Sequence, residues 1–231
     1  MGIHDGHRQR LWEHFRKAGL DDFDEIQVLE LLLFYTIRRR ETNTLAHNLL
    51  NHFGSLATVL EASVEELEQV DGIGHESAVF LHLVTEVGRY YMINRLIKSK
   101  VLTTTEDCGE FLVPRFYGRR NETVFVLCLD AKCKVLACQE ISEGSINSAG
   151  ISPRRVAELA LFSRAASVVL AHNHPSGLAV PSREDVQATY RVEAALDAVE
   201  IVLADHLIIS DGDYTSMLQS GYYKPRSQQP R

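Results

Sequence analysis

The most informative part of this sequence is VVLAHNHPSG at residues 168–177, which is followed closely by PSREDV at residues 181–186. The apolar residues 168–171 predict a short buried strand. Ser182 predicts the N-cap of a helix that reaches about Val199. A strand that leads through a loop into a helix is typical of a mixed α/β fold built around one sheet.

Two histidines and one aspartate in this stretch have the spacing of a metal site. His172 and His174 are two residues apart at the end of the predicted strand, so their side chains lie on the same face. Asp185 falls near the start of the following helix and can bring a carboxylate to the same place. Two nitrogens and one oxygen suit Zn²⁺, and three protein ligands leave a fourth position for water. We therefore predict one zinc ion per chain, which would lower the pKa of that water to about 7.

Each of these residues also has an ordinary explanation. A single histidine is usually a hydrogen-bonded polar residue rather than a ligand. The pair Ser182 and Asp185 also has the shape of a capping box, in which both residues serve only to begin a helix. Taken singly, these interpretations are the simpler ones. The combined pattern H-x-H-x(7)-S-x-x-D is a much rarer coincidence and favours the metal site.

The flanking residues complete an α/β domain that we place at residues 99–226. Ser152 and Pro153 predict the N-cap and first position of a helix that continues to Phe162. Further strands are predicted at 123–130, 135–140, 201–203 and 206–210, with turns at 131–134 and 211–213. Residues 227–231 are expected to form a disordered tail.

Residues 1–98 predict a small domain made only of helices. Apolar residues recur at helical spacing within residues 29–34 and 45–50. Gly54 is expected to end one helix, and Ser63 is expected to begin a short one.

A glycine hairpin in this domain raises the question of DNA binding. VDGIGHESA at residues 70–78 resembles a helix-hairpin-helix, whose backbone N–H groups can bind a DNA phosphate. However, residues 1–98 contain ten Lys or Arg and fifteen Asp or Glu, a net charge of −5. Phosphate affinity comes mainly from neutralising charge, so DNA remains open as a partner but is disfavoured. The alternative is a packing module that docks on the catalytic domain.

Charge, hydropathy and cysteine content indicate which partners and which cellular location are expected for the protein. The net charge of −7 argues against a dedicated nucleic-acid binder. The polar start MGIHDGHRQR argues against a secretory signal, and the longest apolar stretch, residues 31–37, is too short to span a membrane. Four cysteines without a C-x-x-C pair favour a reducing, cytoplasmic location. We interpret Cys128, Cys133 and Cys138 as buried strand thiols rather than metal ligands.

The pattern from His172 to Asp185 resembles the JAMM motif of MPN metallopeptidases. Its wider wording, LAHNHPSG and PSREDV, resembles the bacterial RadC family, which has been labelled as DNA repair proteins. The resemblance covers nearly the whole chain. It includes SPRRV at 152–156 for the family's VHPREV, ADHLII at 204–209 for its LDHIIIG, and YTS at 214–216 for its YxS. It implies an MPN, cytidine-deaminase-like α/β domain with a central mixed sheet behind a helical leader.

The resemblance also implies two catalytic residues. The family has a glutamate in a segment of the form E-L-F-x-G-T, and Glu140 of EISEGS at residues 140–145 matches it. Glu140 is therefore expected to act as general acid and base, and Ser182 to donate a hydrogen bond to the developing oxyanion. The chain departs from the family pattern at Ser142, Ser152 and Arg155. None of these is a ligand position, so the departures concern contacts with the substrate.

These observations predict a zinc metallopeptidase or isopeptidase that acts on a peptide or protein substrate. Two rival hypotheses are a DNA-repair protein whose working part is the hairpin, and a zinc-binding scaffold without turnover. The complete set of Glu, His, His, Ser and Asp favours an enzyme over the scaffold. The acidic helical domain disfavours the repair protein.

Overall fold

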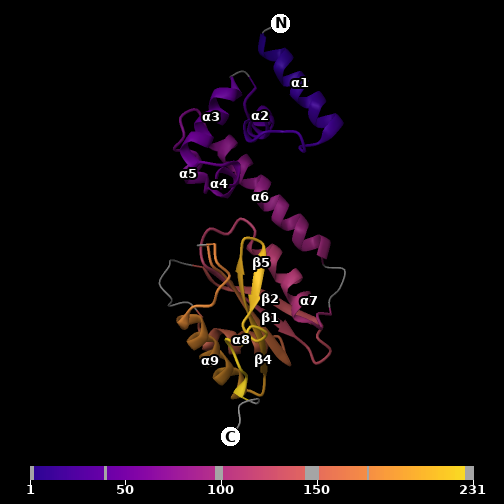
Figure 1. Cartoon of the computed structure of the whole chain (residues 1–231), viewed down its shortest axis with the longest axis vertical. Coiled ribbons are helices and arrows are strands. Elements are labelled where there is room, and N and C mark those ends of the chain that lie inside the picture. The colour runs from indigo at the N-terminus through magenta and orange to yellow at the C-terminus, as the bar shows by residue number, and fades with distance from the viewer. Residues whose placement is uncertain (1–2, 39–40, 97–100, 144–150, 176, 227–231) are drawn as a thin grey trace. The chain divides into compact units, whose positions relative to one another are not determined.

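The computed structural model describes residues 3–38, 41–96, 101–143, 151–175 and 177–226, and it divides into two compact units, residues 1–88 and 89–231 (Figure 1). The division falls inside helix α6 (His75–Leu96), ten residues before the predicted boundary. The predicted boundary between residues 98 and 99 and the predicted disordered tail at 227–231 lie outside the described residues. Within the described part of the chain, no helix has the length and apolar character needed to cross a membrane.

The first unit is helical, as predicted. Its helices before α6 are α1 (Ile3–Ala18), α2 (Glu25–Thr36), α3 (Thr42–Phe53), α4 (Leu56–Glu61) and α5 (Val64–Leu67). The apolar faces of α2 to α6 enclose one core that includes the fully buried Leu29, Leu49 and Leu81. Leu11 of α1 packs in a separate small cluster with Leu31 and Phe34 of α2. Both predicted helix ends are confirmed. Gly54 ends α3 with a φ of 90°, and Ser63 forms a capping box with Glu66 at the start of α5.

The second unit is a five-stranded mixed sheet with helices on both faces (Figure 1). Its strands lie in the order β2-β1-β3-β4-β5, and only β3 and β4 are parallel. The strands are β1 (Thr123–Leu129), β2 (Val135–Glu143), β3 (Ser167–Asn173), β4 (Val202–Ser210) and β5 (Asp213–Ser216). The helices are α7 (Thr105–Leu112), the 3₁₀ turn η1 (Val113–Phe116), α8 (Pro153–Phe162) and α9 (Arg183–Asp197).

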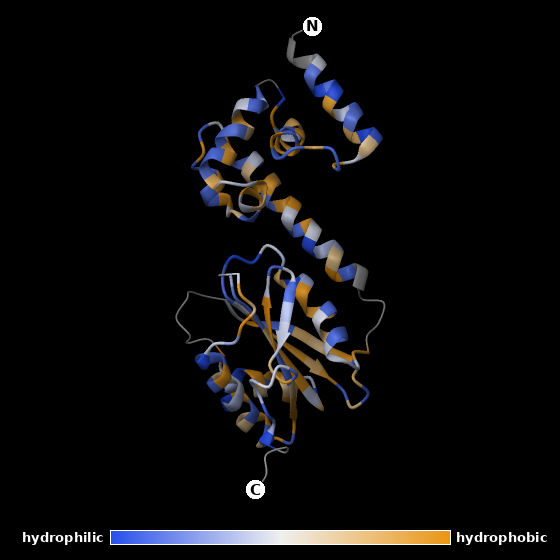
Figure 2. Ribbon diagram, viewed as in Figure 1, coloured by the Kyte–Doolittle hydropathy of each residue, from blue (hydrophilic) through white to orange (hydrophobic). Residues whose placement is uncertain are grey.

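Alternate residues of the central strands enter two different cores. Val126 and Leu170 pack toward α8 and α9, whereas Leu127 and Val169 pack toward α7 and η1. Strands β1 and β3 are therefore covered on both faces, which explains their continuous apolar sequences. The concentration of apolar residues in the sheet is visible in Figure 2.

Two expectations about this unit were wrong in detail. Residues 202–210 form one strand, β4, rather than two, because the ladder with β3 continues through an irregularity between Val168 and Val169. Cys133 is not a buried strand thiol. It lies in the turn between β1 and β2 with a φ of 58°, and its side chain is only partly buried. Cys128 is buried in β1 as expected, whereas Cys138 lies in strand β2 as expected but is only partly buried.

Candidate metal centre

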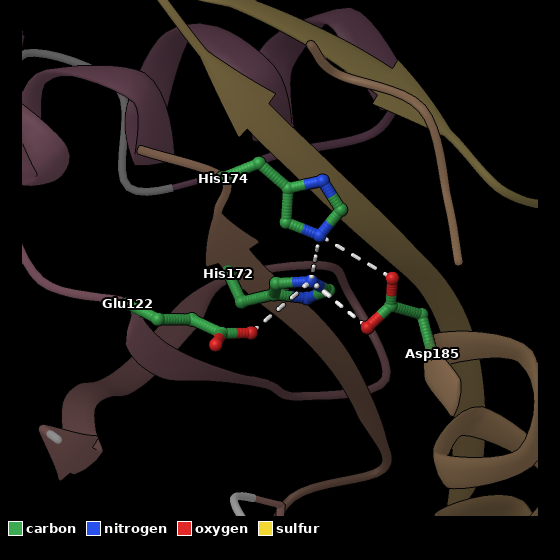
Figure 3. Close-up of side chains that lie close together, drawn as sticks. All are labelled: Glu122, His172, His174 and Asp185. Atoms are coloured by element: carbon green, nitrogen blue, oxygen red, sulfur yellow. Dashed lines mark hydrogen bonds and ion pairs between the residues drawn. The ribbon is translucent and has the colours of Figure 1, made fainter. Parts of the chain in front are cut away.

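The end of strand β3 brings two imidazoles together. His172 is almost completely buried in the strand, and His174 follows it after one residue. The backbone N–H of His174 donates to the carbonyl of Ile209 over 2.8 Å, and this bond joins the end of strand β3 to β4. The two Nε2 atoms are 2.9 Å apart and point toward each other (Figure 3). The i, i+2 spacing thus gives the shared face that the sequence predicts.

The first turn of α9 brings Asp185 to the same place (Figure 3). Its Oδ1 lies 3.1 Å from His172 Nε2, and its Oδ2 lies 3.3 Å from His174 Nε2. Asp185 also completes a capping box. Its N–H donates to Ser182 Oγ over 3.1 Å, and the N–H of Ser182 donates to Asp185 Oδ2 over 2.7 Å. The capping interpretation and the cluster are therefore compatible, because the cap itself fixes the carboxylate.

A fourth member of the cluster, Glu122, is absent from the sequence-based prediction. It immediately precedes β1, and its Oε1 lies 4.0 Å from His172 Nε2. Strand pairing explains its position, because Val124 of β1 lies opposite His172 of β3 in an antiparallel ladder. The start of β1 therefore lies beside the end of β3. In the sequence, Glu122 is only a glutamate in front of a predicted strand. Glutamates in that position are common, so the sequence alone does not identify Glu122 as part of a site.

Asn173 holds the segment that carries Glu122. Asn173 follows His172 in the sequence, its side chain is buried, and its Oδ1 accepts from the N–H of Thr123 over 2.7 Å. Its Nδ2 donates to the carbonyls of Asn121, over 3.1 Å, and Arg119, over 3.3 Å. Both chain neighbours of Glu122 are thus bonded to a residue that lies between two members of the cluster.

The structure does not bring Glu140 to the cluster. It lies in β2, opposite Phe125 of β1, and β1 separates β2 from β3. Its Oε2 accepts from Arg119 Nη2 over 3.0 Å. Its role in proton transfer stays a prediction, and among the described residues Glu122 is the glutamate that lies in the cluster.

The inner atoms of the cluster fit a small divalent ion. Zinc bonds to nitrogen and oxygen of about 2.0–2.1 Å place tetrahedral ligands about 3.3 Å apart. The two Nε2 atoms are 2.9 Å apart, and the nearest Asp185 oxygen lies 3.1 Å (Oδ1) from His172 Nε2 and 3.3 Å (Oδ2) from His174 Nε2. These distances match that spacing, whereas Glu122 lies farther out at 4.0 Å. The set resembles three ligands with an adjacent carboxylate more closely than four equal ligands.

Electrostatics agree with a carboxylate shared by two imidazoles. Burial by itself would raise the pKa of Asp185, but the contacts of its carboxylate with the imidazoles of His172 and His174 outweigh burial, so this pKa is lowered. The hydrogen bond to Asp185 raises the pKa of His174. Asp185 therefore stays ionised, as a metal ligand must.

Comparison with known proteins agrees with this architecture. Residues 102–222 match the family described as RadC-like JAB domain, and this range contains all four members of the cluster. The chain belongs to the RadC-like JAB domain family. A UPF0758 protein of Fusobacterium nucleatum is 32% identical over 94% of this chain and 96% of its own length. UPF0758 proteins of Nitrosococcus oceani and Stutzerimonas stutzeri are each 34% identical, over 95% and 93% of this chain and 96% of their own lengths.

These matches confirm the resemblance to the RadC family and the expected fold, a helical unit followed by a mixed α/β domain. A match to 94% of the chain necessarily includes most of the helical unit. The RadC-family chain therefore shares its two-part organisation with these relatives, and its His, His, Asp and Glu cluster lies within the part that defines the family.

Proposed function

We propose that this RadC-family protein is a zinc-dependent hydrolase that cleaves peptide or isopeptide bonds in a peptide or protein substrate. The observation that supports this proposal is the triangle of His172, His174 and Asp185 with a further carboxylate beside it. Three ligands with an open position are typical of catalytic rather than structural zinc sites.

Zinc held by these residues would supply a Lewis acid and lower the pKa of a water molecule to about 7. The side chains around it divide the remaining work. Glu122 lies beside the ligand triangle, so its carboxylate can accept a proton from the attacking water and return it to the leaving amine. In this proposal, Glu122 takes the role that the family resemblance gave to Glu140.

Ser182 is proposed to stabilise the oxyanion. Its Oγ accepts the N–H of Asp185, which uses a lone pair and leaves the hydroxyl hydrogen available. In the structure as it stands, the Asp185 carboxylate is an acceptor for that hydrogen, which keeps the hydroxyl directed at the cluster. A hydroxyl fixed by a helix cap beside the ligands can therefore donate to the oxygen of a tetrahedral intermediate.

The metal is tested by zinc analysis of the purified protein. We expect about one zinc per chain, the stoichiometry of one ligand set. The double variant His172→Ala/His174→Ala should lose it, whereas His52→Ala, in the helical unit, should keep it. Full zinc occupancy in the double variant would refute the site.

The mechanism is tested with two matched variants, Glu122→Gln and Glu140→Gln. Both changes keep the size and hydrogen-bonding ability of the side chain but remove its basicity. On a peptide or isopeptide substrate that the wild type cleaves, Glu122→Gln should lower the rate by roughly 10²–10⁴-fold at unchanged zinc content. Glu140→Gln should keep most of the rate. The opposite order would restore the role of Glu140, and full activity of both variants would exclude glutamate catalysis.

A further inference from the structure

His172 has a second partner on the side that faces away from the cluster. Its Nδ1 lies 2.8 Å from Nε2 of His206, a residue of the parallel neighbour strand β4 that has no exposed surface. Nδ1 of His206 lies 2.7 Å from the hydroxyl of Thr189, which is also completely buried. That hydroxyl in turn lies 2.7 Å from the backbone carbonyl of Asp185. A buried chain of contacts thus runs from one proposed ligand to another.

The last acceptor fixes the direction of every hydrogen bond in this chain. A carbonyl oxygen can only accept, so the hydroxyl of Thr189 donates its single hydrogen to Asp185. The other nearby acceptor, Met217 Sδ, is 3.5 Å away and is weak. Thr189 Oγ1 must then accept from Nδ1–H of His206. A neutral His206 has only a lone pair left at Nε2, which can accept only from Nδ1–H of His172.

Complete burial favours the neutral form of His206 on which this argument depends. Its two ring nitrogens contact an imidazole and a hydroxyl, and neither contact is with a carboxylate. A charged His206 would donate from both nitrogens and would force His172 Nδ1 to accept. These contacts of His206 therefore select one arrangement of the hydrogens along the chain from His172 Nδ1 to the carbonyl of Asp185.

The same result is reached more simply at His174. Its Nδ1 lies 3.1 Å from the carbonyl of Leu178, which can only accept, so Nδ1 carries the hydrogen. In both histidines, Nδ1 is therefore bound to a partner outside the cluster, and Nε2 points into it. His174 is fixed by a carbonyl directly, whereas His172 is fixed by a carbonyl through two intermediate side chains.

We infer that His206 and Thr189 are positioning residues, which keep the proton of His172 on Nδ1 so that Nε2 presents its lone pair to the metal. A metal-binding histidine usually donates the N–H of its other ring nitrogen to a hydrogen-bond acceptor, and loss of that acceptor typically lowers metal affinity. The inference depends on the proposed zinc site only for its consequence, because the position of the proton can be measured without metal.

The decisive variants are Thr189→Val and Thr189→Ser. Valine has nearly the shape of threonine but lacks the hydroxyl. Without that acceptor, the hydrogen of His206 can move from Nδ1 to Nε2, and Nδ1 of His172 can then accept it. Serine keeps the hydroxyl. Nitrogen-15 NMR of the histidine rings in the metal-free protein should show a proton on Nδ1 of His172 in the wild type and in Thr189→Ser. Thr189→Val should lose it in part or completely.

Zinc affinity, measured by competition with a chelator, gives the second readout. Thr189→Val should bind zinc about 10–100-fold more weakly than the wild type, and Thr189→Ser should stay within about threefold. His206→Gln, whose amide can both accept and donate, should bind zinc more tightly than His206→Leu. Wild-type affinity in Thr189→Val would overturn the inference.

The NMR result for the wild type decides the matter even if Thr189→Val does not fold. An unprotonated Nδ1 in metal-free His172 would overturn the inference whatever the protein binds. If the wild type bound no zinc, the proposed function would fail, and the proton position would still test the inference separately. If the variants showed the expected zinc affinities but no substrate were cleaved, the proposed hydrolase function would be wrong and the inference about His206 and Thr189 would stand.

Discussion

Replacing Asn173 by Ala removes the side chain that holds the segment around Glu122. The amide of Asn173 makes three hydrogen bonds, to the N–H of Thr123 and to the carbonyls of Asn121 and Arg119. Because Asn173 is bonded to both chain neighbours of Glu122 and is not itself in the cluster, its loss is expected to release Glu122 without removing any ligand. The variant therefore separates the position of Glu122 from the binding of the metal.

The size of the effect follows from the burial of each partner. Thr123 is completely buried, so its N–H would lose its partner without access to water, at a cost of about 1–3 kcal/mol. Asn121 is exposed, so its carbonyl can bind water instead at little cost. We therefore expect the second unit to lose about 2 kcal/mol of stability. For a domain of this size, that loss lowers the melting temperature by about 4–8 °C.

Calorimetry of the metal-free protein measures the melting temperature, and amide hydrogen exchange reports on Thr123 directly. Asn173→Asp is the matched variant, because its carboxylate still accepts from Thr123 but cannot donate to the two carbonyls. Thr123 should therefore exchange faster in Asn173→Ala and stay protected in Asn173→Asp. Both variants should hydrolyse substrate more slowly. Wild-type melting and wild-type protection of Thr123 in Asn173→Ala would refute the hydrogen-bond account.

Four further predictions concern pH, the glycine hairpin, DNA and the metal. The hydrogen bond to Asp185 raises the pKa of His174 above its ordinary 6.5, so a proton competes with zinc below that raised pKa. Chelator-buffered titrations should show affinity falling by about tenfold per pH unit as pH drops through it, and a flat profile from pH ~8 to ~5.5 would contradict this. Gly72→Ala should destabilise the helical unit by more than ~1 kcal/mol, because Gly72 has a φ of 87° and a Cβ there would lie 2.5 Å from Leu45 Cδ2. Gly74→Ala, with no atom within 4 Å of its Cβ, should melt like the wild type, and equal losses in both variants would exclude this explanation. The full chain should bind duplex DNA at physiological salt no more tightly than a non-specific Kd of about 10⁻⁶ M, and submicromolar, salt-sensitive binding would revive the repair hypothesis. Chelation of zinc should leave the circular dichroism spectrum of the protein unchanged, whereas unfolding would show that the site is structural.

The sequence predicts the parts of the fold and site that depend on local spacing. Ser182 and Asp185 are three residues apart, so the helix cap and the carboxylate follow from the same pattern. His172 and His174 share a face because alternate residues of a strand always do. In each case the geometry is set by neighbours along the chain.

Glu122 could not be predicted in this way because it reaches the cluster through strand pairing. It is 50 residues before His172, and only the antiparallel ladder of β1 with β3 brings the two together. Nothing in the order of residues states which strands are neighbours. Glu140 illustrates the same point in reverse, because a matching motif placed it near the site, whereas the strand order β2-β1-β3 keeps it one strand away.

Each member of the cluster is held by a hydrogen-bonding group that does not depend on the metal. Ser182 fixes Asp185, Asn173 fixes the segment of Glu122, and the carbonyl of Leu178 fixes His174. His206 fixes His172 in the same way from β4. Most of these groups lie on strands or helix ends that pack against the two apolar cores. Folding of the unit therefore already orders the site, and metal binding does not have to offset the conformational entropy lost in that step. Metal binding is then not required for folding of the unit, unlike at a structural zinc site, where folding and metal binding occur together.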